Sequence, residues 1–370
     1  MQKLLYITDQ DEYVDHSFIA PLFEIYLKKH MHIDIVYFTE YKSDFEHKET
    51  HRFTVPSRYK NVLLAELKRN NINLASYDYI MVRNNIHIMK HVLKHKDIYH
   101  YKTAYRFSFP KRRVKLCCDE AENKKSFFSH IIHRIKTKQE TNIINQCDVF
   151  LPTSAMMHKI FLPQVNIPTI ICPPGINPAV LHENMQHDRE EKCFIYAGTL
   201  DKMREFETIL DAFSSIENKN WKLFISTRDT EYALHMMQKY THIKDHIKLH
   251  NAKTKEALLS LIAKADVGIA LLPDKPIYTT STPVKIFDYY ASAVPCLMTL
   301  SEHTSTIFTD CKDAWFCNFT QEDIKEKIEY ILSLDKQTLM EVGESGQQQL
   351  LEMKNYKTIA KEIATKLQAL

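Results

Sequence analysis

The sequence has 370 residues, of which 44% are hydrophobic and 26% are charged, and a formal net charge of +3. This length allows two domains of ordinary size, each with its own core. The small net charge gives no general affinity for nucleic acid, so we expect no nucleic-acid partner.

No targeting signal stands out in the sequence. The apolar stretch at the N-terminus is too short for a signal-peptide core, and no apolar run approaches the roughly 20 residues that span a bilayer. The eight cysteines show no Cys-x-x-Cys spacing, which favours a reducing compartment. We therefore expect a cytoplasmic protein, either soluble or peripheral at the inner face of the membrane.

The first half of the chain alternates predicted strands and helices. Short apolar runs predict strands at residues 3–8, 33–39, 79–82, 148–151 and 167–172, and helical patterns cover 18–29, 59–70 and 126–145. Such alternation predicts a doubly wound α/β domain with a parallel sheet. Ligands of such sheets bind at the carboxyl ends of the strands.

The second half repeats this alternation. Predicted strands cover 192–197, 221–226, 247–250, 267–272 and 295–299, with helices between them and two terminal helices after them. The turn-rich residues 173–178 mark the junction. We expect an N-terminal, acceptor-side domain over 1–173, a C-terminal, nucleotide-binding domain over 174–350, and a last helix in 351–370 that packs back toward the first domain.

The five glycines all lie in the second half, from Gly175 onward. The first strand-to-helix turn therefore lacks the G-x-G-x-x-G pattern that binds dinucleotides. This absence argues against an enzyme that uses NAD or FAD.

Residues 265–295 carry the clearest indication of a ligand. A predicted buried strand is followed by a loop and a helix, with Thr282 as the expected N-cap and Pro283 at the first helical position. The N-terminus of this helix attracts phosphate, and Lys285 adds charge. Asp288, further along, suits the hydroxyls of a sugar, so the pair indicates a nucleotide sugar. An ordinary capped helix on an α/β sheet is the alternative.

Residues 90–115 are strongly basic and contain several aromatic side chains. This composition fits an anionic membrane surface or an acidic acceptor, and a solvated basic face is the alternative. His87, His91 and His95 would share one helix face, where two histidines can bind zinc. No H-E-x-x-H arrangement accompanies them, so we expect no metal.

Three segments resemble a known family when taken together. They are CDVFLPTSAMMHKIF with ICPPGINPAVLHE, then FIYAGTLDKMREFETILDAF, then ADVGIALLP with TPVKIFDYYASAVPCL. The chain resembles the family 4 glycosyltransferases of GT-B fold. The resemblance implies two Rossmann-like domains facing across a cleft, a nucleoside-diphosphate sugar as co-substrate, and transfer that retains the anomeric configuration.

The resemblance also implies roles for residues of the second half. The turn at the end of the first strand there corresponds to Gly198 and Thr199, and Asp288 takes the place of the acid that binds the donor ribose. Asp288 is the second of two acidic positions in the family, and Thr280 occupies the first, where the family acid contacts the donor sugar, so the identity of that sugar is open. The residues that would contact the donor diphosphate are Arg204, Lys202, Lys285, Thr282, Ser281 and Val284.

The first half departs further from the family. The family histidine near the donor sugar is missing from TAYRFSFP, where Arg106 or Ser108 would substitute, and Asp11 lies in an acidic first turn on the acceptor side. We expect a metal-independent, retaining glycosyltransferase without a cofactor that uses a UDP or GDP sugar. The acceptor would be a glycan or lipid-linked glycan in cell-surface polysaccharide synthesis. The alternatives are a sugar-nucleotide epimerase of GT-B fold and a non-catalytic sugar-binding or scaffold protein.

Overall fold

The computed structural model describes residues 1–11, 20–41, 44–49, 51–114, 127–182 and 190–370. The chain forms two compact units. Unit 1 consists of Met1–Pro173 together with Tyr356–Leu370, and unit 2 of Pro174–Asn355. We describe each unit separately.

Unit 1 is built on a seven-stranded sheet with the strand order β3-β4-β2-β1-β5-β6-β7. All described strand pairs are parallel except β3 with β4. The inner strands are nearly continuous apolar runs because both faces of a parallel sheet are covered. The strands are β1 (Lys3–Asp11), β2 (His32–Thr39), β3 (Glu46–Glu49), β4 (Arg52–Pro56), β5 (Tyr79–Arg83), β6 (Lys102–Phe107) and β7 (Val149–Pro152).

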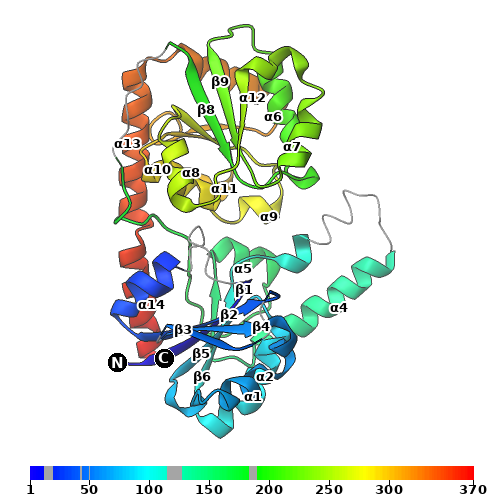
Figure 1. Cartoon of the computed structure of the whole chain (residues 1–370), viewed down its shortest axis with the longest axis vertical. Helices are drawn as coiled ribbons and strands as arrows, with labels where there is room; N and C mark the ends of the chain where they lie inside the picture. The colour runs from blue at the N-terminus through cyan, green and yellow to red at the C-terminus, as the bar shows by residue number, and fades with distance from the viewer. Residues whose placement is uncertain (12–19, 42–43, 50, 115–126, 183–189) are drawn as a thin grey trace. The chain divides into compact units, whose positions relative to one another are not determined.

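The helix α14 (Tyr356–Ala369) belongs to unit 1 although it follows unit 2 in the chain (Figure 1). It packs on η1 (Ala20–Tyr26), and its buried face joins the core that Leu4 and Phe23 help to form. The Tyr79 hydroxyl donates to the Leu367 carbonyl at 2.7 Å. Further helices of unit 1 are η2 (Leu27–Lys29), η3 (Ser57–Val62), α1 (Leu63–Arg69), η4 (Leu74–Ser76), α2 (Ile86–Tyr99), α4 (Phe127–Ile144) and α5 (Ala155–Phe161).

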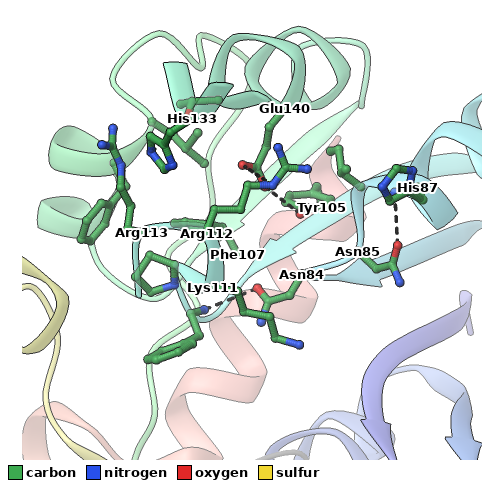
Figure 2. Close-up of a pocket in the computed structure, with 16 residues that line it drawn as sticks. Asn84, Asn85, His87, Tyr105, Phe107, Lys111, Arg112, Arg113, His133 and Glu140 are labelled. Atoms are coloured by element: carbon green, nitrogen blue, oxygen red, sulfur yellow. Dashed lines mark hydrogen bonds and ion pairs between the residues drawn. The ribbon is translucent and has the colours of Figure 1, made fainter. Parts of the chain in front are cut away.

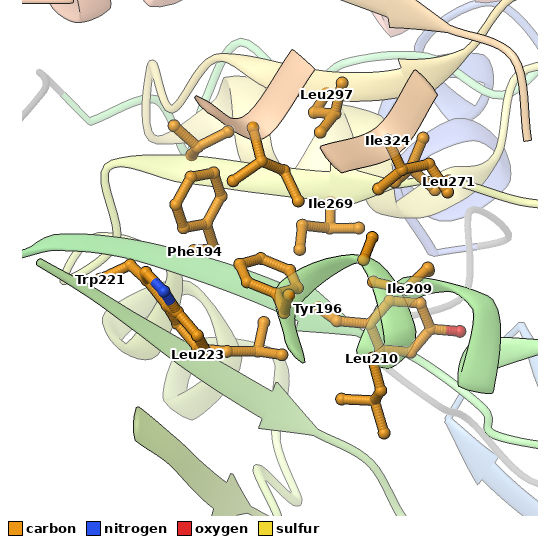
Figure 3. Packing of buried hydrophobic residues seen from close by; sticks show 14 of the residues in the cluster. Phe194, Tyr196, Ile209, Leu210, Trp221, Leu223, Ile269, Leu271, Leu297 and Ile324 are labelled. Atoms are coloured by element: carbon orange, nitrogen blue, oxygen red, sulfur yellow. The ribbon is translucent and has the colours of Figure 1, made fainter. Parts of the chain in front are cut away.

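Unit 2 contains a six-stranded parallel sheet with the strand order β10-β9-β8-β11-β12-β13. Figure 3 shows the core on one face of this sheet, where Phe194 and Tyr196 lie among side chains such as Ile269, Leu223 and Ile209. The strands are β8 (Lys192–Ala197), β9 (Trp221–Ser226), β10 (Ile247–His250), β11 (Val267–Ala270), β12 (Cys296–Thr299) and β13 (Trp315–Cys317).

The helix α10 (Val284–Ala291) is fixed tightly to this sheet by Tyr289. The Tyr289 hydroxyl accepts a hydrogen bond from the Ala197 amide at 2.9 Å and donates one to the Ile269 carbonyl at 3.2 Å. A Cβ on Gly268 would lie 2.4 Å from the Tyr289 ring, so the glycine allows this approach. The other helices of unit 2 are η5 (Lys202–Arg204), α6 (Phe206–Ser214), α7 (Thr230–Met237), η6 (Thr241–His246), α8 (Lys255–Ile262), α9 (Pro276–Thr279), α11 (Glu302–Ser305), α12 (Gln321–Ser333) and α13 (Lys336–Met353).

The two Rossmann-like sheets confirm the predicted fold class, and three details differ. The predicted strand at 167–172 is reduced to an isolated bridge between Phe150 and Thr169. The next pairing is incomplete because Pro152, which accepts from the Cys172 amide, has no N–H to donate in return. Strand β6 (Lys102–Phe107) lies within residues 90–115, for which we predicted a basic surface. Helix α10 begins at Val284 with Pro283 as its N-cap, so the prediction of Thr282 as N-cap was wrong by one residue.

Candidate functional site

The candidate site of unit 2 lies where β8 ends and α10 begins. Gly198 follows β8 with φ of +142°, a backbone conformation that L side chains rarely adopt. The Lys285 side chain reaches this turn, since a Cβ on Gly198 would lie 3.4 Å from the Lys285 Nζ. The structure therefore brings together the strand-end turn and the first turn of α10.

Lys285 is a buried cation in an unusual setting. Its Nζ lies 3.6 Å from the centre of the Tyr196 ring, and it has no hydrogen-bond partner among the described residues. Burial, and secondly the charge of Arg204, hold the Lys285 pKa well below its usual value. A buried ammonium without an acceptor is costly, whereas a phosphate in hydrogen-bonding reach would offset that cost.

Arg204 lies in the short helix η5, which follows the strand-end turn. Its guanidinium pairs with Asp201, and its backbone N–H donates to the same carboxylate at 3.0 Å. The guanidinium carbon lies 5.8 Å from the Tyr278 ring centre. Because Arg204 also acts on the pKa of Lys285, the two cations share one electrostatic environment.

The other predicted residues of this turn are more exposed. Thr199 is exposed, and its carbonyl accepts a hydrogen bond from the Tyr196 hydroxyl at 2.9 Å. Lys202 is exposed on η5 and lines a surface hollow with Glu207 and Tyr232. Among the residues that the structure describes, Lys202 makes no hydrogen bond, ion pair or ring contact with Lys285, so its predicted part in diphosphate binding rests on the resemblance alone.

Asp288 is buried on α10 and forms an ion pair with Lys255 at the start of α8. The sequence reading missed Lys255. A lysine in the first turn of a helix lies near the positive end of the helix dipole, which is unfavourable. The position of Lys255 in the sequence could therefore have indicated an acidic partner. The pair offers a carboxylate oxygen and an ammonium in one place, a suitable combination for vicinal hydroxyls.

Thr280 and Thr282 are both held by hydrogen bonds within unit 2. Thr280 is 0% exposed, and its hydroxyl donates to the Pro276 carbonyl at 2.8 Å. This burial argues against the predicted contact of its side chain with a donor sugar. The Thr282 hydroxyl lies 3.1 Å from the His303 Nε2, a partner that the sequence reading also missed. Ser281 is half-buried, and Val284 is 39% exposed.

We predict that His303 makes unit 2 sensitive to acid. Burial, and secondly the charge of Lys354, lower the His303 pKa to about 4 from its ordinary 6.5. Between these values the unfolded chain binds a proton that the folded chain does not, so the free energy of unfolding falls as the pH drops from 6.5 to about 4. The loss should be on the order of 2 kcal/mol. His303→Gln should remove it, as measured by urea unfolding at pH 7 and pH 4.5.

The exposed His235 provides the control for this experiment. His235→Gln should leave the pH dependence as in the unmodified protein. An unchanged pH dependence in His303→Gln would contradict the prediction.

The predicted residues of unit 1 do not form one exposed cluster. Arg106 is 0% exposed within β6, and its guanidinium donates to the Leu151 carbonyl at 3.1 Å and the Thr153 hydroxyl at 3.3 Å. This placement favours a structural role over contact with an acceptor. The Ser108 hydroxyl accepts from the Arg83 Nε at 2.7 Å. Asp11 ends β1, and its side chain lies outside what the structure describes.

The basic stretch from residue 90 to 115 is dispersed by the fold. Lys96 pairs with Asp148 at 3.1 Å, and Arg106 is in the core. Arg112 lines a pocket beside Glu140, while Lys115 lies outside the described residues. The stretch is therefore not a single solvated face.

The histidines His87, His91 and His95 lie on α2 as predicted. Within the ranges that the structure describes, no group of three or more His, Cys, Asp or Glu residues could hold a metal ion. Over the same ranges, each helix is either too short or too polar to span a bilayer.

Comparison with known proteins shows a family match in the second half of the chain and the fold of the whole chain. Residues 180–349 match the family model for glycosyl transferases group 1. The fold resembles sucrose-phosphate synthase from Thermosynechococcus elongatus, with TM-score 0.73 and 14% identity over 100% of this chain and 99% of that one. No curated protein matches the sequence.

Two further solved structures agree with this result. Anabaena HepE in complex with UDP and glucose has TM-score 0.72 and 12% identity over 100% of both chains. The UDP-forming α,α-trehalose-phosphate synthase from Burkholderia xenovorans, in complex with glucose 6-phosphate, has TM-score 0.69 and 11% identity over 98% of this chain and 99% of that one. The chain therefore has the GT-B fold of these structures, and residues 180–349 within it match the glycosyl transferases group 1 model.

Proposed function

We propose that the chain is a retaining, metal-independent glycosyltransferase that binds the nucleoside diphosphate of its donor in unit 2. The observation that carries this proposal is the buried Lys285 ammonium, which has no hydrogen-bond partner among the described residues and lies beside the Gly198 turn. Arg204 supplies a second cation nearby. Two cations beside a strand-end turn and a helix N-terminus suit a diphosphate.

The proposed reaction relies on electrostatic stabilisation and positioning. The bond between the anomeric carbon and the diphosphate breaks, and Lys285 and Arg204 stabilise the charge on the departing phosphate. A bond forms between the same carbon and the acceptor hydroxyl oxygen on the same face, and the hydroxyl proton passes to the departing phosphate. No protein general base is needed, and positioning of the acceptor contributes the rest.

We propose a uridine nucleotide as the first donor to test, with a GDP sugar as the next. HepE, whose fold this chain shares, is described in complex with UDP. The Asp288 carboxylate, paired with Lys255, would bind the ribose hydroxyls. The acceptor would be a glycan or lipid-linked glycan used in cell-surface polysaccharide synthesis, and the enzyme would work in the cytoplasm or at the inner face of the membrane. Lys111, Arg112 and Arg113 support an anionic partner there.

A thermal-shift panel of UDP, GDP, CMP and ADP sugars, first without and then with metal, tests the proposal. A ligand that binds only the folded state stabilises it by about 2.7 kcal/mol at a hundred times its Kd. We expect a shift with one nucleotide class that Asp288→Asn abolishes. The control Glu329→Gln, at a partly exposed residue that pairs with Lys325 on α12, should leave the shift unchanged. Asn keeps the size of Asp288 while removing its charge.

The outcome also separates the proposed function from other functions of this fold. Donor binding followed by conversion of the donor sugar without an acceptor would identify an epimerase. Binding without any turnover would identify a sugar-binding protein. No shift with any nucleotide from a folded sample would contradict the proposal.

A further inference from the structure

Unit 1 contains a cavity of about 210 Å³ that the donor site does not use. It opens where β5 and β6 end, and its walls include residues from the start of α2, from α4 and from the end of α5 (Figure 2). Pockets for drug-sized ligands measure about 300–1,000 Å³. This cavity is therefore sized for one chemical group of a ligand with a short piece of its framework.

The charges that line the cavity are mainly positive. Its charged lining residues, with histidines counted as neutral, are Lys111, Arg112, Arg113 and Glu140, three cations and one acid. Burial raises the Glu140 pKa, and the nearby Arg112 charge opposes that shift only in part. The lining thus carries an excess of positive charge.

Arg112 is held in position by the wall of the cavity. Its Nε lies 3.8 Å from a Glu140 carboxylate oxygen, and its Nη1 donates to the Lys136 carbonyl at 2.9 Å. Figure 2 shows Arg112 extended toward Glu140 and Tyr105, whose hydroxyl donates to Glu140 at 3.4 Å. An arginine fixed in this way loses little side-chain entropy when it binds an anion.

Arg113 differs from Arg112 in its partners. It acts on the Glu140 carboxyl through its charge, but its guanidinium makes no hydrogen bond or ion pair within the described part of the chain. The first N–H groups of α2, at His87 and Ile88, already donate to the Asn85 side chain. The arginines, and not that helix N-terminus, are therefore the groups available to an anion.

The remaining wall is apolar and aromatic. Tyr105 and Phe107 of β6 and Phe161 of α5 line it. A fully ionic ligand such as a free metal complex gains nothing from these rings, whereas the carbon framework of a sugar or lipid packs against them. The cavity thus combines cations for an anionic group with a surface for the carbon atoms next to it.

We propose that this cavity binds a phosphate group of the acceptor, with Arg113 and Arg112 as its ligands and the aromatic wall against the adjoining carbons. The inference rests on the proposed glycosyltransferase function and names the acceptor class, a phosphorylated one. Arginine suits phosphate because its planar fork engages two oxygens. The phosphate belongs either to a sugar phosphate or to an isoprenoid lipid phosphate.

The test is calorimetric titration of the full chain saturated with UDP, which occupies the proposed donor site. The probes are glucose 6-phosphate and farnesyl phosphate, each compared with its uncharged parent, glucose or farnesol. We expect one phosphate probe to bind and its parent not to bind measurably. The probe that binds distinguishes the sugar phosphate from the lipid phosphate.

Substitutions then locate the binding. Arg113→Gln should weaken the phosphate probe at least about tenfold, because it removes a charge-assisted hydrogen bond. Arg134→Gln is the matched control, since Arg134 is exposed on α4 and does not line the cavity. Arg112→Gln should weaken the same probe. If that variant fails to fold after losing its contact with Glu140, the result for Arg113→Gln alone tests the proposed site.

Three results would overturn the inference: neither phosphate probe binds, the control Arg134→Gln weakens binding as much as Arg113→Gln, or the uncharged parents bind as well as the phosphates. Failure of the donor site is recognised separately, because UDP binding is measured in the same experiment. Should UDP not bind, the titration is repeated on Lys285→Met, which removes the candidate anion site of unit 2. Binding that remains sensitive to Arg113→Gln would still support the cavity.

Discussion

Lys285→Met should stabilise the protein without ligand while it abolishes sugar transfer. The substitution replaces a buried ammonium that lacks a hydrogen-bond partner among the described residues with an apolar chain of similar length. Removing such a charge should raise the free energy of unfolding by about 1–4 kcal/mol. The rate of UDP release from the donor should fall at least ~100-fold, because Lys285 stabilises the charge that develops on the diphosphate in the transition state.

The pH dependence of stability provides a second measurement on the same variant. The Lys285 pKa is below its usual 10.5 in the folded state. From the folded-state pKa up to 10.5, the unfolded chain binds more protons, so the stability of the unmodified protein should rise with pH in that window. Lys285→Met should lose this rise.

Lys325→Met is the control for both measurements, because Lys325 is a partly exposed residue of α12 that pairs with Glu329 one turn along the same helix. It should change stability by no more than about 0.5 kcal/mol. A Lys285→Met protein that is less stable than the unmodified one, and that still responds to UDP, would show that Lys285 is a structural residue.

Arg204→Ala should lower the turnover of any donor by at least ~100-fold. The expected cause is the loss of a cation that acts on the departing diphosphate together with Lys285. Arg204→Lys keeps the charge but not the planar fork of the guanidinium. Its turnover should therefore lie between that of the unmodified enzyme and that of Arg204→Ala. Turnover is measured as UDP release from the donor that the binding panel selects.

The control for Arg204 is Lys325→Ala in the same unit, which should retain full turnover. Folding is checked by thermal unfolding, since Arg204 also pairs with Asp201 in η5. An Arg204→Ala enzyme within a few-fold of the unmodified rate would remove Arg204 from the site.

The alternation of strands and helices was predictable because the buried strands of parallel sheets are nearly continuous apolar runs. The same reasoning failed for β6. Its sequence includes Lys102 and Arg106, and charged residues of this kind are rarely buried. Arg106 is nevertheless 0% exposed because carbonyl and hydroxyl oxygens of β7 and the residue after it accept its hydrogen bonds.

The candidate site was predictable only in part. The sequence indicated that Lys285 and Asp288 lie near the start of one helix, because a turn of helix has a local signature. The residues that contact this helix from other segments have no such local signature. Tyr196 lies under Lys285, Lys255 pairs with Asp288, and His303 contacts Thr282, each through the alignment of distant segments.

The position of α14 affects the order in which the chain can fold during synthesis. A ribosome completes all of unit 2 before it adds Tyr356 and the residues after it. Domains generally fold as units as they emerge. Unit 2 has its entire core by then, whereas unit 1 still lacks Ile359, Ile363 and Leu367. The half of the protein that is made first should therefore be the half that finishes folding last.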